Sequence, residues 1–88
     1  MTEIQIEIIN KAGLHARAAS KLAELCASFG SDIRVGHEKM VDGKSILSLM
    51  MLAAVKGTTL TITASGPDEE SALDAISTLI NNRFDEGE

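Results

Sequence analysis

The clearest strand of the chain reads Thr59-Leu60-Thr61-Ile62-Thr63-Ala64-Ser65. Its polar and apolar residues alternate, and a period of two gives a strand one apolar and one polar face. Gly66-Pro67-Asp68 then predicts a turn and a helix cap. Because one face of the strand is polar, it fits an antiparallel sheet that is covered on one side only.

Two periodicities predict the other elements on either side of this stretch: a period of two for strands and a period of about 3.6 residues for helices. We expect strands over 3–8, 31–35 and 38–41 and helices over 16–28, from 45 and from 69. Apolar side chains at these spacings are expected to face the core: Ile4, Ile6, Ile8, Ala19, Leu22, Cys26, Phe29, Ile33, Val35, Leu73, Ile76, Leu79 and Ile80. The order βαββαβα predicts an α+β open-faced β-sandwich, a four-stranded, mainly antiparallel sheet covered on one side by three helices.

Length and charge limit the class of protein. The 88 residues suffice for one domain over 1–88, with a frayed acidic tail over 85–88. Two Phe and no Trp or Tyr leave no aromatic platform on which bases could stack. A net charge of −5 repels a phosphate backbone, so we expect no nucleic-acid partner.

Cys26 is the only cysteine, which excludes an internal disulfide and is typical of a reducing cytosol. His37 lies in a turn without a second ligand nearby, so it is expected to be a surface residue. No metal site and no cofactor are therefore predicted. The N-terminal residues have neither the pattern of an export signal nor that of a membrane span, and we expect a cytoplasmic monomer.

A candidate site for phosphoryl chemistry lies in Gly13-Leu14-His15-Ala16-Arg17, where a loop enters the first helix. Backbone N–H groups at a helix start lack partners and can hold an anion. The positive end of the helix dipole disfavours a cation there, so we expect a neutral imidazole at His15, with one ring nitrogen able to attack phosphorus. Arg17 adds a planar fork of donors for phosphoryl oxygens. On spacing alone, an ordinary capping or solvated histidine stays open as the alternative.

Two segments in the same order resemble the signatures of one family: Gly13-Leu14-His15-Ala16-Arg17-Ala18-Ala19 and Gly43-Lys44-Ser45-Ile46-Leu47-Ser48-Leu49. The family is HPr, the histidine-containing phosphocarrier of the bacterial phosphoenolpyruvate-dependent sugar phosphotransferase system, and the resemblance covers essentially the whole chain. It implies a carrier, not an enzyme, that takes a phosphoryl group from Enzyme I onto His15. Arg17 would assist transfer to sugar-specific Enzyme IIA domains. The family most often has Pro where this chain has Ala18, which costs only some rigidity.

Ser45 is expected to be the N-cap of the second helix, because serine is favoured there. The resemblance adds a regulatory role, since the serine of this signature is phosphorylated by HPr kinase/phosphorylase in many bacteria. A phosphate there would add nearly two negative charges to a docking surface.

The helix that follows Ser45 has too many apolar residues for one buried face. Three of them are predicted to face the sheet: Ile46, Leu49 and Ala53. The partner-binding candidates lie on another face: Leu47, Met50 and Met51. For Leu47 and Met50 we predict exposure, because the matching positions in the family contact partners. For Met51, exposure and burial are equally open.

Three other functions stay open at this point. A carrier of the nitrogen-related phosphotransferase branch would use the same His15 chemistry with regulatory acceptors. A regulatory interaction module would dock through Leu47 and Met50 with His15 idle. An unrelated α+β metabolite-binding domain would need a pocket, and no Gly-rich phosphate loop marks one.

Overall fold

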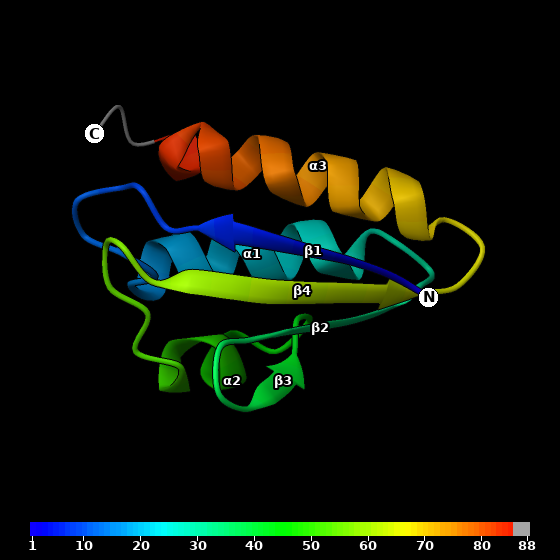
Figure 1. The fold of residues 1–88 in the computed structure, drawn as a ribbon, viewed down its shortest axis with the longest axis horizontal. Helices are drawn as coiled ribbons and strands as arrows, with labels where there is room; N and C mark the ends of the chain where they lie inside the picture. Colours follow the sequence, from blue (N-terminus) through cyan, green and yellow to red (C-terminus); the bar gives the residue numbers. More distant parts are fainter. Residues whose placement is uncertain (86–88) are drawn as a thin grey trace.

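The computed structural model describes residues 1–85, which form four strands, three α-helices and a terminal 3-10 turn (Figure 1). In chain order these are β1 (Thr2–Glu7), α1 (Ala16–Ala27), β2 (Asp32–Gly36), β3 (Met40–Asp42), α2 (Ile46–Met51), β4 (Thr59–Ser65), α3 (Glu69–Asn81) and η1 (Arg83–Asp85). The predicted order βαββαβα is confirmed. Residues 86–88 of the predicted frayed tail lie outside the described residues, and Asp85 belongs to η1.

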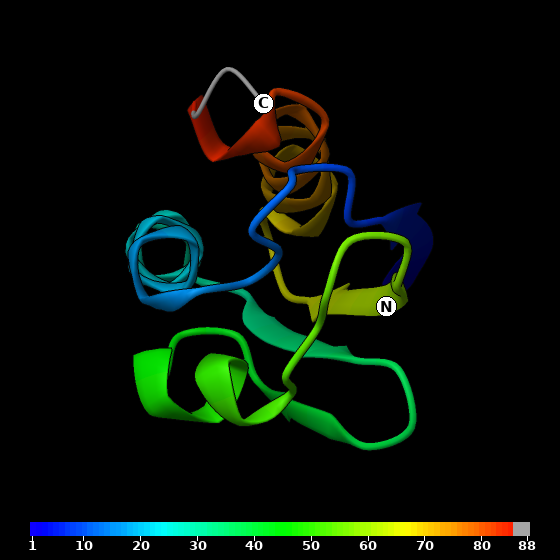
Figure 2. The same ribbon diagram turned by 90° about the vertical axis from the view of Figure 1, so that its left-hand side faces the viewer.

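The sheet has the strand order β1-β4-β2-β3, and every neighbouring pair is antiparallel. Ile62 of β4 lies opposite Ile4 of β1 on one side and Val35 of β2 on the other. Residues opposite each other in a sheet share a face, so these three side chains form one apolar row. Seen from the side, all three helices lie against one face of the sheet and the other face is open (Figure 2). The predicted open-faced sandwich is therefore confirmed.

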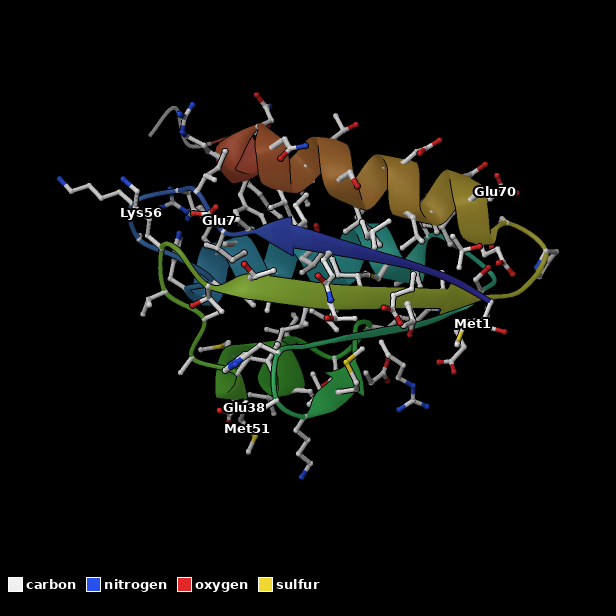
Figure 3. All side chains as sticks on the ribbon, in the orientation of Figure 1. Met1, Glu7, Glu38, Met51, Lys56 and Glu70 are labelled. Atoms are coloured by element: carbon white, nitrogen blue, oxygen red, sulfur yellow. The ribbon has the colours of Figure 1, made fainter. Side chains whose placement is uncertain are left out.

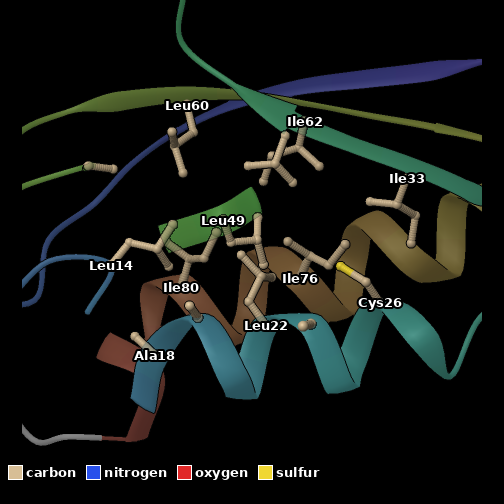
Figure 4. Packing of buried hydrophobic residues seen from close by; sticks show 14 of the residues in the cluster. Leu14, Ala18, Leu22, Cys26, Ile33, Leu49, Leu60, Ile62, Ile76 and Ile80 are labelled. Atoms are coloured by element: carbon tan, nitrogen blue, oxygen red, sulfur yellow. The ribbon is translucent and has the colours of Figure 1, made fainter. Parts of the chain in front are cut away.

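The core fills the space between the sheet and the helices (Figure 4). Leu22 and Cys26 of α1 pack there with Ile33 and Ile62 of the sheet, and all four are fully buried. Burial raises the pKa of the Cys26 thiol to about 12, so this cysteine is a core residue, as predicted. The other predicted core residues lie in the same cluster, where Ile4, Ile6, Phe29 and Leu79 are only partly buried.

The hairpin between β2 and β3 differs from the sequence prediction. The structure pairs Gly36 with Met40, so β2 extends to Gly36 and β3 starts two residues later than expected. A Cβ on residue 36 would lie 2.1 Å from the carbonyl oxygen of Lys39. The turn can close this tightly because residue 36 is a glycine, and residues 37–39 form the loop.

Asp68 occupies the N-cap position of α3 but makes no capping hydrogen bond to that helix, contrary to the prediction. Its carboxylate instead accepts hydrogen bonds from the backbone N–H of Gly30 at 2.9 Å and of Ser31 at 3.0 Å. The hydroxyl of the buried Ser31 also donates to it. These bonds tie the start of α3 to the turn between α1 and β2. The Ser31 hydroxyl, followed by the Gly30 N–H, lowers the pKa of Asp68 below its ordinary value.

Asp68→Asn is expected to destabilise the protein at pH 7 and to matter less in acid. A carboxyl whose pKa is lower in the folded than in the unfolded chain contributes stability above the unfolded pKa, near 3.8 for Asp. That contribution disappears as pH falls through the folded pKa. Urea unfolding at pH 7 and pH 3 measures the difference, with Asp74→Asn, an exposed carboxylate of α3, as control. A loss of equal size at both pH values would contradict the assignment.

Candidate functional site

The loop before α1 fixes the position of His15. The backbone N–H of Gly13 donates to the carbonyl of Asn10 at 3.2 Å, which closes a turn over residues 10–13. Gly13 has a φ of +68°, and a Cβ there would lie 2.6 Å from the carbonyl oxygen of Ala54. Only glycine fits this conformation and this close approach. The next residue, Leu14, is buried in the core, so the chain enters α1 from an anchored position.

His15 is the N-cap residue of α1 and has an extended backbone, with φ −77° and ψ −179°. Its carbonyl accepts the N–H of Ala19 at 2.8 Å, which starts the helix, while its side chain makes no capping hydrogen bond. The half-buried imidazole therefore stands at a helix start whose first N–H groups it does not cap. This is the position that the sequence predicted for His15.

Arg17 lies in the first turn of α1, two residues after His15, and is exposed. No acidic residue lies in that turn, so the helix start itself supplies no carboxylate to pair with the guanidinium. Ala18 is fully buried against the core. The first turn thus presents its arginine to solvent and its alanine to the interior, as an amphipathic helix requires.

The second signature forms the start of α2. The Ser45 side chain accepts a hydrogen bond from the Ser48 N–H at 3.3 Å, which confirms the predicted N-cap. The neighbouring Lys44 donates through its ammonium to the carbonyl of Phe29 at 2.9 Å, just beyond the end of α1. Residues 44 and 45 therefore connect α2 to the neighbouring helix. Ser45 lies at the far end of α2 from the loop that carries His15.

The outward face of α2 carries large apolar side chains. Leu47 is 74% exposed, Met50 41% and Met51 83%, so the predicted exposure of Leu47 and Met50 is confirmed and Met51 is exposed as well. Met51 projects away from the body of the molecule (Figure 3). We call Leu47, Met50 and Met51 the α2 face. Val55, which no periodicity in the sequence marks because it follows the helix, is also 66% exposed.

The predicted inner stripe of α2 is wrong in two of its three residues. Leu49 is fully buried, but Ile46 is 41% exposed and Ala53 is exposed. The helix has only six residues and ends at Met51, so less than two turns are available and only Leu49 faces the core. Ala53 lies beyond the C-cap with φ +51°, a left-handed conformation in which the chain leaves the helix.

The loop of His15 and the end of α2 lie side by side. The N–H of Leu14 donates to the carbonyl of Ala54 at 2.8 Å, and a Cβ on Gly13 would lie 3.0 Å from Cα of Val55. The structure thus brings the His15 loop together with the segment that follows the α2 face. His37, as predicted, is exposed, and its Nε2 lies 3.2 Å from the carbonyl of Leu52.

The structure is an open-faced βαββαβα sandwich with a histidine at the N-cap of its first helix, and comparison with known proteins gives its family. Residues 2–82 match the family described as the PTS HPr component phosphorylation site. HPr of Pseudomonas aeruginosa is 53% identical over the full length of both chains. NPr of Shewanella violacea is 46% identical, covering 96% of this chain and 93% of its own.

A solved structure of HPr from Thermoanaerobacter tengcongensis aligns with a TM-score of 0.94 at 41% identity and covers 98% of both chains. The chain belongs to the HPr family and is a phosphocarrier protein of the phosphotransferase system. Within residues 1–85, no helix is long and apolar enough to cross a membrane.

Proposed function

We propose that His15 is the residue that carries the phosphoryl group, from phosphorylated Enzyme I to sugar-specific Enzyme IIA domains. The observation that supports this most is its position as a half-buried N-cap whose side chain does not cap α1. A ring nitrogen attacks phosphorus and forms a new N–P bond, while the N–P bond to the donor histidine breaks and its electron pair returns to the donor. The first N–H groups of α1 then face the phosphoryl oxygens.

Arg17 is proposed to stabilise the group in transit. Its guanidinium is always charged and offers paired donors that match phosphoryl oxygens. It is exposed in the turn that starts at His15, so it can reach a group shared between two proteins. The charge that spreads over these oxygens during transfer is what an arginine at this position stabilises.

The decisive experiment incubates the protein with phosphoenolpyruvate and Enzyme I and follows its intact mass. We expect one added phosphoryl group that is lost in acid and kept in alkali, and peptide fragmentation should place it on His15. The group should pass to an Enzyme IIA domain when one is added. A protein that stays unmodified, or a modification mapped to another residue, would refute the proposal.

The α2 face is proposed as the surface on which these partners dock. Methionine and leucine side chains adapt to surfaces of different shape, which suits a carrier that meets several proteins. The hydrogen bond from Leu14 to Ala54 joins the loop of the proposed phosphoryl acceptor to the segment that follows this face. A partner held there would have its own reactive group close to His15. Rapid exchange of partners requires a weak contact.

Leu47→Asp is expected to raise the KM for phosphorylation by Enzyme I about tenfold and to leave kcat within about twofold. The substitution places a charge on an exposed apolar contact, which weakens docking, but does not touch the reacting atoms. Steady-state kinetics measure both constants. Met40→Asp, which changes an exposed apolar residue of β3, is the matched control and should behave like the native protein. Equal KM values for the two variants would mean that Enzyme I does not dock on the α2 face.

Ser45 is proposed as a regulatory phosphorylation site. Its hydroxyl is at the start of the helix that carries the α2 face, so a phosphate would add nearly two negative charges beside the docking contacts. Incubation with ATP and HPr kinase should label the native protein. Ser45→Asn should not be labelled although asparagine preserves the cap, whereas Ser48→Ala should be labelled normally. Labelling of Ser45→Asn would contradict the assignment.

A second candidate is carriage for the nitrogen-related branch. The 46% identity to a protein named NPr, not far below that to HPr relatives, favours testing it. The reaction at His15 would be the same and only the donor and acceptor proteins would differ. Transfer from the phosphorylated protein to Enzyme IIA domains of each branch, at equal concentrations, separates the two.

A further inference from the structure

The peptide group between Gly13 and Leu14 is held at both of its polar ends. Its carbonyl oxygen accepts a hydrogen bond from Nδ2 of Asn10 at 2.7 Å, and its N–H donates to the carbonyl of Ala54 at 2.8 Å. The two partners come from different parts of the chain, one from the loop itself and one from the segment after α2. A peptide held at both ends cannot rotate without breaking one of these bonds. The peptide group that follows it is the one that carries the N–H of His15.

Asn10 is fully buried, which is uncommon for an asparagine in a loop. Placing an amide in the interior costs free energy unless it forms hydrogen bonds there. The bond from the Asn10 side chain to the carbonyl of Gly13 offsets part of that cost. The carbonyl of Asn10 also accepts the N–H of Gly13, so both the main chain and the side chain of this residue hold the turn. Asn10 thus holds the loop from within its own turn, and the buried Ala54 holds it from the segment after α2.

We propose that Asn10 is a positioning residue for His15. By holding the Gly13–Leu14 peptide it fixes the direction in which the chain enters α1 and so the direction of the imidazole. A phosphoryl transfer between two proteins depends on alignment of donor and acceptor, so a loosened loop slows the chemical step. The effect on the rate rests on the proposed role of His15, whereas the effect on the position of the ring does not.

Two substitutions remove the amide donor. Asn10→Asp preserves size and adds a charge, and Asn10→Leu preserves approximate size without a charge. Both should lower kcat for phosphorylation by Enzyme I about tenfold and leave KM within about twofold, because the α2 face is intact. Lys11→Ala, an exposed neighbour in the same turn, is the local control. Ile80→Val, in the core part of α3, is the control for lost stability.

A second readout does not depend on phosphorylation. The chain has two histidines, so NMR signals of the His15 ring can be followed with those of His37 as an internal reference. We expect the His15 signals to move in both Asn10 variants and to stay in place in Ile80→Val and Lys11→Ala. The proposal is overturned if the His15 signals do not move, if only Asn10→Asp is slow, or if Ile80→Val is slowed as much. Should even the native protein accept no phosphoryl group, the function of His15 fails and the ring signals still decide the role of Asn10.

Discussion

His15→Ala is expected to abolish uptake of an acid-labile phosphoryl group completely. The substitution removes the nucleophile, and no neighbouring group replaces it within the turn, where Ala16, Arg17 and Ala18 follow. The variant should fold normally, because the half-buried side chain of His15 is not part of the core cluster. Intact-mass measurement after incubation with phosphoenolpyruvate and Enzyme I checks the first statement, and circular dichroism checks the second.

The matched control is His37→Ala, which removes the other histidine of the chain. His37 is exposed in the loop between β2 and β3 and contacts the carbonyl of Leu52. The His37→Ala variant should take up the phosphoryl group at the native rate. If His15→Ala is still modified while His37→Ala is not, the roles of the two histidines must be exchanged.

Phe84→Ala is expected to lower the free energy of unfolding by about 3–5 kcal/mol, the usual cost of removing a fully buried aromatic ring. The ring is part of the core cluster, and the turn that carries it packs against α1 and α3. A typical domain has only about 5–15 kcal/mol of stability in total, so this variant would lose a large part of it. Urea unfolding followed by circular dichroism measures the change.

Phe29→Ala is the control for Phe84→Ala, because Phe29 is the other phenylalanine and is only partly buried. Its loss should be clearly smaller, since less apolar surface returns to water. A loss below about 1 kcal/mol for Phe84→Ala would mean that η1 is not part of the folded core.

The strands and the two long helices could be predicted from the sequence because their apolar residues repeat with a regular period. Phe84 could not be predicted in the same way. It follows the last helical repeat, and residues 83–85 all have a left-handed backbone, which is uncommon outside glycine and which no local pattern indicates. The chain turns back there, and the ammonium of Lys21 donates to the carbonyl of Phe84 at 2.8 Å. Such a turn depends on contacts between distant parts of the chain.

The candidate site shows the same division. The position of His15 at a helix start followed from the order of loop and helix residues. The exposure of Leu47 and Met50 was predicted from the family resemblance, in which the matching positions contact partners. The role of Asn10 was missed, although an asparagine three residues before a glycine is a turn signal that could have pointed to it. The end of α2 at Met51 was also missed, because Ala53 was expected to lie on the helix, whereas it has a left-handed backbone beyond the C-cap.

The strand order has a consequence for how the protein behaves when it is concentrated. The strands β1 and β3 are the edge strands of the sheet, and another chain can pair with an unprotected edge strand. One edge strand, β3, is only three residues long. The other, β1, carries Glu3 and Glu7, and two such strands brought together would repel each other. We therefore expect the protein to resist edge-to-edge aggregation at concentrations at which a protein with a long apolar edge strand would aggregate.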